Sequence, residues 1–290
     1  MNRKMLTCFL LILLLAQCCV AYAIDTDEGE IILGTDDMPY ITEIYSYKER
    51  KSCTKLKLID TGNEFNVFYV KKLMCMPNIE ELYIQKGVYL DDYSKLKAFR
   101  KLRVLSLPNQ YLTDISFLAD LPNLEEVYLN HNLIQNIDAI EALKHLKIID
   151  LSDNNITDIS ALKNETGLIE LYLDSNKELS DLEAISSLRN LEVLSISGTN
   201  VKDLSPISGL TDMDSLYFDG CKVEDITCLS ELTKMFCLDM RYNSIKNIEP
   251  LSKMHELKYL YLAGNPITDY SVLDLLHKSL ESAMYEPLDW

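Results

Sequence analysis

The sequence predicts an α/β solenoid, with a curved parallel sheet on its concave side and loops or short helical turns on its convex side. Three observations predict it. Eight similar segments begin 22 residues apart from Leu102 to Leu257, with one step of 23 between Leu168 and Leu191. Each segment has apolar residues at its first, fourth and sixth positions, and five segments have asparagine at the ninth. Because so short a unit cannot bury its own apolar side chains, we expect the copies to stack.

One copy, LKIIDLSDNNI, illustrates the element expected in each repeat. Ile149 and Leu151 alternate with polar residues, which predicts a short strand with both side chains in the core. Leu146 enters the core from the preceding turn, and Ile156 belongs to the segment that closes back over it. The amide of Asn154 can bond backbone groups where the chain turns inward, so that they are not buried without partners.

The signature LxxLxLxxNxI, seen in this copy and again from Leu257, resembles that of the leucine-rich repeat family in its 22-residue form. The resemblance covers about residues 77–270 and includes a weaker copy that begins at Ile79. It implies a solenoid that binds a protein partner on its concave face, and among such proteins the chain looks most like the secreted bacterial internalin type. The ninth position departs from asparagine at four places: Gly87, Gln110, Thr199 and Cys221. Because glycine has no side chain, we expect the first copy to be irregular.

Four segments are expected along the chain. Residues 1–23 resemble a secretory signal peptide, with a basic start, an apolar run and a cleavage site after Ala23. Lipid attachment at Cys18 is the competing interpretation of this start. Residues 24–76 are expected to form an N-terminal cap of mixed structure, and residues 77–270 eight full repeats and one degenerate repeat. Apolar residues at helical spacing predict a helical C-terminal cap over residues 271–290.

Charge and cysteine content narrow the functions. The formal net charge is −17, and removal of residues 1–23, which contain two basic and no acidic residues, leaves −19. Nucleic acid and anionic lipid would be repelled, whereas a basic protein surface would be attracted. After Ala23 no apolar run is long enough to span a membrane. Five cysteines remain there, and whether Cys53 and Cys75 pair is left open.

The fifth position of each strand is expected to face the concave side, and tyrosine occupies every second copy there. Alternate tyrosines would stand about 10 Å apart and leave slots between their rings, floored by serine or aspartate. Such rings and acids suit a binding face. The partner-binding residues predicted are Tyr83, Tyr128, Asp150, Tyr172, Asp174, Tyr217, Asp219, Asp239, Arg241, Tyr242, Tyr259 and Tyr261.

Enzyme chemistry is not expected. The four histidines share no metal-ligand spacing, and Cys237 has no histidine on a neighbouring strand to act as its base. No glycine-rich phosphate loop is present. Exposed acids such as Asp158 and Asp203 read as solvated turn residues. No cofactor, metal site or catalytic residue is therefore predicted.

The sequence favours a secreted or surface-exposed protein-binding module that recognises a protein partner through its concave face. Two other functions stay open. The same repeat resembles cytosolic regulatory subunits of protein phosphatases, a role that a signal peptide opposes. A structural component of an envelope or matrix is the third, and it predicts a concave face that tolerates substitution. Neither the partner nor the oligomeric state follows from the sequence.

Overall fold

The computed structural model describes residues 30–34, 46–60, 66–276 and 279–284. They belong to two compact units, one ending at Leu102 and the other beginning at Arg103. The expected signal peptide and Cys18 lie outside the described residues. Within the described part of the chain, no helix has the length and apolar character needed to cross a membrane.

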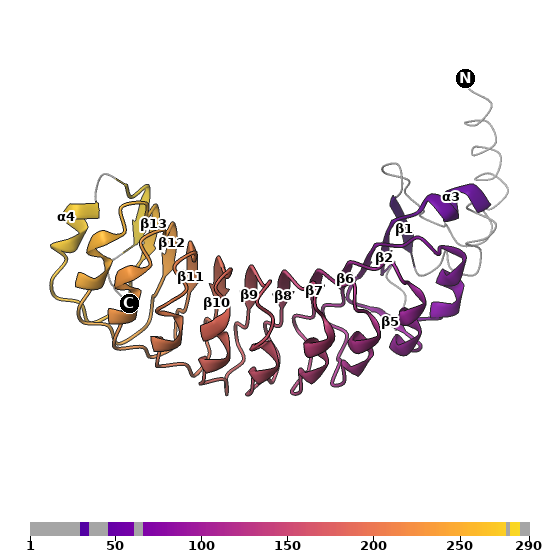
Figure 1. The fold of residues 1–290 in the computed structure, drawn as a ribbon, viewed down its shortest axis with the longest axis horizontal. Helices are drawn as coiled ribbons and strands as arrows, with labels where there is room; N and C mark the ends of the chain where they lie inside the picture. Colours follow the sequence, from indigo (N-terminus) through magenta and orange to yellow (C-terminus); the bar gives the residue numbers. More distant parts are fainter. Residues whose placement is uncertain (1–29, 35–45, 61–65, 277–278, 285–290) are drawn as a thin grey trace, which may run out of the picture. The chain divides into compact units, whose positions relative to one another are not determined.

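The second unit contains nine strands that pair in sequence order, and every pairing recorded between neighbours is parallel. The strands are β6 (Val104–Ser106), β7 (Glu126–Tyr128), β8 (Ile148–Asp150), β9 (Glu170–Tyr172), β10 (Val193–Ser195), β11 (Ser215–Tyr217), β12 (Cys237–Asp239), β13 (Tyr259–Tyr261) and β14 (Ser282–Met284). They line the inner side of an arc, and short helices line its outer side (Figure 1). The predicted repeat solenoid is confirmed for this unit.

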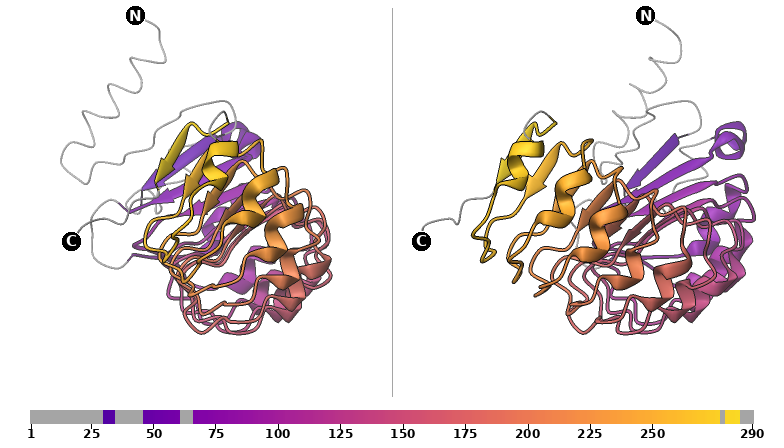
Figure 2. Two further views of the ribbon diagram at one scale, coloured as in Figure 1. Left: turned by 90° about the vertical axis from the view of Figure 1, so that its left-hand side faces the viewer. Right: turned by 60° about the vertical axis from the view of Figure 1, so that its left-hand side comes forward.

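The outer side is built from one-turn 3₁₀ helices, which stack along the flank of the unit (Figure 2). They are η4 (Ser116–Asp120), η5 (Asp138–Ala142), η6 (Ser160–Leu162), η7 (Glu183–Ser187), η8 (Ser205–Ile207), η9 (Thr227–Glu231) and η10 (Glu249–Lys253). Pro206 and Pro250 stand in the first turns of η8 and η10, where a missing backbone N–H costs no hydrogen bond.

Apolar residues at the first, fourth and sixth positions of the repeat form the core, as the alternation predicts. Ile149 and Leu151 are both fully buried, and Leu146 is 1% exposed. The pairing register joins equivalent positions of successive repeats, such as Val127 with Ile149. The longer step after Leu168 does not shift this register, because the extra residue falls in the segment after β9.

Asparagine at the ninth position bonds two neighbouring repeats together. Asn154 Nδ2 donates to the carbonyl oxygens of Leu129 and Leu151 at 3.1 and 2.9 Å, and its Oδ1 accepts from the N–H of Ile134 at 3.0 Å. Where the residue is not asparagine, other bonds form. The Thr199 hydroxyl donates to one carbonyl of its own repeat.

Two further repeat positions have roles that the sequence analysis missed. The eighth has a positive φ in every full copy, from 52° at Tyr242 to 77° at Gly264. The thirteenth, or the fourteenth in the copy from Leu168 that holds the extra residue, is always aspartate or asparagine, and its side chain accepts from the backbone N–H two residues later. These residues are Asp114, Asn136, Asp158, Asp181, Asp203, Asp225, Asn247 and Asp269.

The interpretation of Asp158 and Asp203 as solvated turn residues is therefore incomplete, because each accepts from the N–H of the first residue of a helical turn. These hydrogen bonds lower the pKa of both carboxyl groups, the bond from the backbone N–H having the largest effect. A capping acid keeps its charge where the first N–H groups of a turn need acceptors.

The first unit contains more repeat-like structure than its sequence suggests. Its elements are β1 (Glu30–Gly34), α3 (Tyr47–Ser52), β2 (Lys55–Ile59), β3 (Asn66–Phe68), η2 (Val70–Cys75), β4 (Glu81–Ile84), β5 (Val88–Leu90) and η3 (Tyr93–Ala98). Strands β1, β2 and β4 pair in parallel, and β3 pairs with β5. Residues 24–76, expected to form a cap of mixed structure, thus include parallel strands, in which buried Leu56 and Leu58 take core positions without the rest of the repeat signature.

The C-terminal segment is only partly helical. Helix α4 (Val272–Leu276) is followed by strand β14, which pairs in parallel with β13. Val272 and Leu276 are buried, but Leu275 is 61% exposed. An all-helical cap over residues 271–290 is therefore corrected to one short helix and a strand within its described part.

Candidate functional site

The fifth positions of strands β6 to β13 lie side by side, as predicted. The register places Tyr128 between Ser106 and Asp150, and Tyr172 between Asp150 and Ser195. With the third and seventh positions they form one surface, which we call the inner face. Its tyrosines are half-buried, because the rings stand between neighbouring strands.

Two tyrosines of the inner face are fixed by a glutamate of their own strand. The hydroxyl of Tyr128 donates to Glu126 Oε2 at 2.9 Å, and that of Tyr172 donates to Glu170 Oε2 at 2.7 Å. Burial, followed by this bond to a carboxylate, raises the pKa of Tyr172. The sequence carried a signal for these pairs, because glutamate stands two residues before each tyrosine.

The slot expected between Tyr172 and Tyr217 is closed. Ser195 lies between them in the register and is only 6% exposed. Its hydroxyl donates to Asp174 Oδ1 at 2.6 Å, and the N–H of Ser197 donates to the same oxygen at 2.7 Å. Desolvation nevertheless raises the pKa of Asp174, with the charges of Asp150 and Asp219 adding to the effect. The Asp174 carboxylate therefore already bonds to groups of the inner face itself.

Asp239 is also occupied from within the chain. The guanidinium of Arg241 donates from Nε to Oδ1 at 2.9 Å and from Nη2 to Oδ2 at 2.6 Å, and it lies 5.6 Å from the ring centroid of Tyr261. Asp239 is 6% exposed. This pair raises the pKa of Arg241 and fills the expected slot between Tyr217 and Tyr261.

Aromatic side chains gather on and beside the C-terminal part of the inner face. The Tyr259 ring meets Phe236 edge to face, with centroids 5.4 Å apart, and its hydroxyl donates to Glu281 at 3.4 Å. Tyr242 is 46% exposed, and its ring lies against Gly264. A Cβ at Gly264 would stand 2.5 Å from Tyr242 Cδ1, so glycine leaves the space that this ring occupies.

Tyr83 belongs to the first unit and is placed there by its own contacts. Its hydroxyl donates to Glu81 Oε2 at 3.0 Å, and Lys55 Nζ lies 5.4 Å from its ring centroid. Lys55 also forms an ion pair with Glu81 at 3.4 Å. The other eleven predicted residues belong to the second unit.

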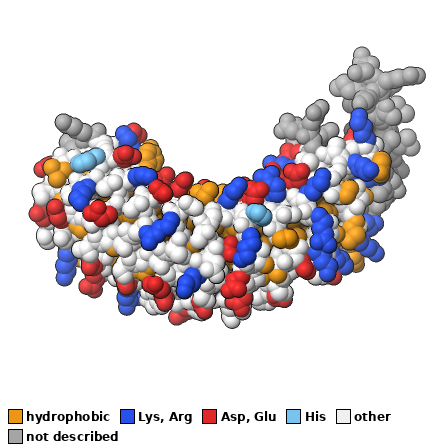
Figure 3. Space-filling view, viewed as in Figure 1, with side chains coloured by type: hydrophobic (Ala, Val, Ile, Leu, Met, Phe, Trp, Pro, Cys, Tyr) orange, Lys and Arg blue, Asp and Glu red, His pale blue; other side chains and the backbone are white. Residues whose placement is uncertain are grey.

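The inner face of the second unit is acidic. The third, fifth and seventh positions of β6 to β13 hold six carboxylates, with Arg241 as the single basic residue. The carboxylates are those of Glu126, Asp150, Glu170, Asp174, Asp219 and Asp239. On the flank shown in Figure 3, charged side chains of both signs are interspersed. Excess negative charge is thus present on the inner face but is not confined to it, because residues 103–290 contain 31 acidic and 14 basic residues.

The described part of the chain contains histidine, cysteine and acidic side chains, the residue types that a metal or catalytic centre would need. No group of three or more histidine, cysteine, aspartate or glutamate side chains there could hold a metal ion. The cysteines after the expected signal peptide, Cys53 and Cys75 among them, are free thiols. Burial raises the thiol pKa of both Cys53 and Cys228 to about 12 and that of Cys237 to a lesser extent. Such thiols are protonated at neutral pH and are poor nucleophiles.

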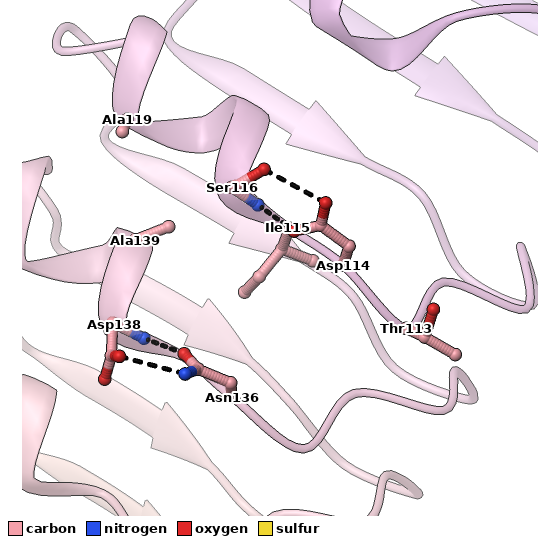
Figure 4. A pocket seen from close by; sticks show the side chains of 8 residues that line it. All are labelled: Thr113, Asp114, Ile115, Ser116, Ala119, Asn136, Asp138 and Ala139. Atoms are coloured by element: carbon pink, nitrogen blue, oxygen red, sulfur yellow. Dashed lines mark hydrogen bonds between the residues drawn. The ribbon is translucent and has the colours of Figure 1, made fainter.

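A surface pocket of about 500 Å³ lies between η4 and η5 (Figure 4). Its polar side chains already bond one another. Asp114 accepts from both the N–H and the hydroxyl of Ser116. Asn136 accepts from the N–H of Asp138 and donates from Nδ2 to Asp138 Oδ2. The small side chains of Ala119 and Ala139 line the pocket. Its polar groups bond at the starts of two helical turns.

The fold defines a repeat solenoid with an open sheet face, and comparison with known proteins gives the family. The family model described as leucine-rich repeats (2 copies) matches residues 100–142, 122–164, 189–231 and 233–275, which together cover just over half of the chain. The chain belongs to the leucine-rich repeat family. No curated protein sequence matches it significantly.

Solved structures with this fold include three from bacteria. Internalin C2 of Listeria monocytogenes is 27% identical, with a TM-score of 0.61 over 67% of this chain and 83% of that one. An internalin, inlF, of the same species is 22% identical, with a TM-score of 0.71 over 88% and 86% of the two chains. A leucine-rich repeat protein of Leptospira interrogans is 24% identical, with a TM-score of 0.72 over 90% and 73%. The chain thus resembles internalins, and the last two likenesses concern the fold alone.

Proposed function

We propose that this protein is a secreted or surface-exposed binding module that recognises a protein partner through the inner face of its second unit. One observation carries the proposal: a row of tyrosines and acids lies on an open sheet face, and hydrogen bonds fix two of its tyrosines. A leucine-rich repeat solenoid is consistent with protein binding, and it holds the row in register on a rigid support.

Fixed rings favour binding for a physical reason. A side chain that is immobilised on association loses rotamer entropy, at a cost of about 0.5–1.5 kcal/mol. Because Tyr128 and Tyr172 are each bonded to a glutamate before any partner arrives, they lose less. Tyrosine also offers a large contact area with a polar tip.

The charge of the inner face identifies the complementary surface. Six carboxylates against one guanidinium favour a partner that is basic where it makes contact. The proposed contact residues are the eleven predicted in the second unit, with Tyr83 as a separate contact of the first unit. Asp239 and Arg241 contribute as a neutral pair, because each already neutralises the other.

Export is supported by the sequence of residues 1–23 and by the similarity to internalins. Whether the exported protein is released or held by a lipid at Cys18 follows from its mature N-terminus. Mass spectrometry of that terminus distinguishes cleavage after Ala23 from lipid attachment. An N-terminus that retains residues 1–23 would contradict export through this signal.

The binding proposal is tested by replacing three inner-face tyrosines with alanine, at Tyr128, Tyr172 and Tyr217. A matched control variant replaces the exposed tyrosines Tyr47, Tyr69 and Tyr111, which lie off the inner face. After cooperative melting has been confirmed for both, each is used to capture proteins from a surface extract of neighbouring cells. We expect the inner-face variant alone to lose a partner that the parent captures. An identical set of captured proteins for all three would contradict the proposal.

A further inference from the structure

Two places on the inner face have an aspartate between two tyrosines, each residue from a different strand. Asp150 lies between Tyr128 and Tyr172 in the strand register, and Asp239 lies between Tyr217 and Tyr261. We call these sets of three residues the Asp150 slot and the Asp239 slot. Both aspartates also make the same local bond, because Oδ1 accepts from the backbone N–H two residues later, at 3.0 Å from Ser152 and 3.2 Å from Arg241.

The two slots differ in what the residue at the seventh position supplies. In the Asp239 slot that residue is Arg241, whose guanidinium makes a bidentate contact with Asp239 and lies over the Tyr261 ring. In the Asp150 slot it is Ser152, whose side chain carries no positive charge. Among the described residues no hydrogen-bond donor reaches Asp150 Oδ2, and Asp150 is more exposed than Asp239.

The walls of the Asp150 slot are rigid. Tyr128 and Tyr172 are held by Glu126 and Glu170, so both rings keep their places when the slot is empty. Strands two apart in a sheet are separated by about 9.6 Å, which leaves room for one planar group between the rings. The carboxylates of Glu126 and Glu170 add negative charge beside the opening.

The first unit shows the same preference with a different cation. Lys55 lies over the ring of Tyr83 and pairs with Glu81, the glutamate that also accepts from the Tyr83 hydroxyl. In both units, therefore, a basic side chain of the chain itself occupies a place between a tyrosine ring and an acid. At the Asp150 slot the seventh-position residue is Ser152, so that position supplies no basic side chain.

We propose that the Asp150 slot receives an arginine side chain of the protein partner, in the position that Arg241 takes in the Asp239 slot. This inference rests on the proposed function of the inner face. Arginine fits better than lysine, because its planar guanidinium can bond both carboxylate oxygens and stack on an aromatic ring at once. The cation over a tyrosine face adds its own attraction.

The test uses a probe peptide, acetyl-Gly-Arg-Gly-amide, with the full-length protein carrying ¹³C-labelled tyrosine rings. A single anchoring side chain binds weakly, so the titration extends to about 20 mM. We expect saturable shifts of the Tyr128 and Tyr172 ring signals, at least fivefold weaker binding of the lysine peptide, and no binding of the neutral citrulline peptide. Absence of these shifts, or equal shifts with citrulline, would overturn the inference.

Variants of the chain provide matched controls. Ser152→Arg copies the arrangement of Arg241 and is expected to fill the slot with a side chain of the protein itself. The affinity for the arginine peptide should fall at least tenfold, while the melting temperature stays the same. Asp150→Asn keeps the acceptor for the Ser152 N–H, removes the charge, and should weaken the peptide to a similar degree. Arg241→Ser empties the other slot and should add shifts of Tyr217 and Tyr261. Parent-like binding by both Ser152→Arg and Asp150→Asn would refute the proposal.

The outcomes separate this inference from the proposed function. If the tyrosine variant loses a partner but the arginine peptide leaves Tyr128 and Tyr172 unchanged, the inner face binds proteins by other chemistry and the arginine inference fails. If the peptide occupies the slot but the tyrosine variant captures every partner, the slot exists and the proposed function fails.

Discussion

Asn176 is wholly buried between two repeats, and its amide makes four hydrogen bonds there. Oδ1 accepts from the N–H of Ile156, while Nδ2 donates to the carbonyl oxygens of Leu151, Leu173 and Asp174. All of these partners are backbone groups in the segments that follow strands β8 and β9. A single side chain thus joins the turn of one repeat to that of the next, which explains why the residue type recurs.

The change Asn176→Ala should lower the free energy of unfolding by about 2–4 kcal/mol, because it leaves buried backbone groups without partners. Urea unfolding monitored by circular dichroism measures the loss. The exposed neighbour Asn155 is the control, and Asn155→Ala should cost less than about 0.5 kcal/mol. Equal losses for the two variants would show that the amide is not what joins the repeats.

Glu125 stabilises the fold in a pH-dependent way. It accepts from Arg103 Nε at 2.6 Å and from Lys147 Nζ at 2.7 Å, and these bonds lower its pKa from 4.5 to about 2. Because the folded pKa lies below the ordinary value, this stabilisation is present above pH 4.5 and disappears as the pH falls toward 2.

Glu125→Gln should therefore lower the free energy of unfolding at pH 6 by about 1 kcal/mol, in the range of surface ion pairs. Parent and variant should differ less as the pH falls toward 2, because a growing fraction of Glu125 becomes neutral like glutamine. Urea unfolding of the two proteins at several pH values gives the difference directly. A difference that does not change with pH would contradict the lowered pKa.

At the scale of one element, an acid or amide stands two residues before each 3₁₀ helix of the second unit and accepts from the N–H of its first residue. The expected gain at each start is modest, but it recurs along the whole outer side. The sequence alone does not reveal the role of these acids and amides, because aspartate and asparagine are common in any turn. Only the hydrogen bond to the N–H two residues later distinguishes a cap from a solvated acid.

Asp114 is the position at which to test the cap, because its side chain accepts from both the N–H and the hydroxyl of Ser116. Asp114→Ala should cost about 0.5–2 kcal/mol of unfolding free energy, and Asp114→Asn should keep most of it. Thermal and urea unfolding of the pair provide the measurement. If alanine and asparagine were equivalent to the parent, the cap would have no energetic role.

The strands show what the sequence could and could not predict. The 22-residue spacing and the apolar positions predict every strand from β6 to β13. Alternation along the strand predicts that Tyr128 points away from the core, onto the concave side. The closure over Ser195 and the filling of the Asp239 slot could not be predicted, because both depend on side-chain contacts between different repeats. Strands β1 and β2 were missed since they keep the buried leucines but lack the asparagine that marks a repeat.

At the scale of the molecule, the second unit combines a rigid stack with an acidic inner face. The stack fixes the spacing of side chains that are far apart in the sequence, as Asp150 and Asp239 illustrate. The long-range attraction of such a face for a basic partner should weaken as salt is added. Function on this account belongs to the face and not to any single residue, although one slot gives it a preference for arginine.

One measurement tests the central claim, that the inner face is the binding surface, most directly. Binding of a captured partner is compared for two variants with the same change in net charge. One carries Asp150→Lys and Asp219→Lys on the inner face, and the other carries Glu141→Lys and Glu183→Lys in the outer helices η5 and η7. The account predicts a loss of at least tenfold in affinity for the first variant and nearly parental affinity for the second. Equal losses would make net charge the cause, and a loss confined to the outer variant would place the binding surface on the other side of the solenoid.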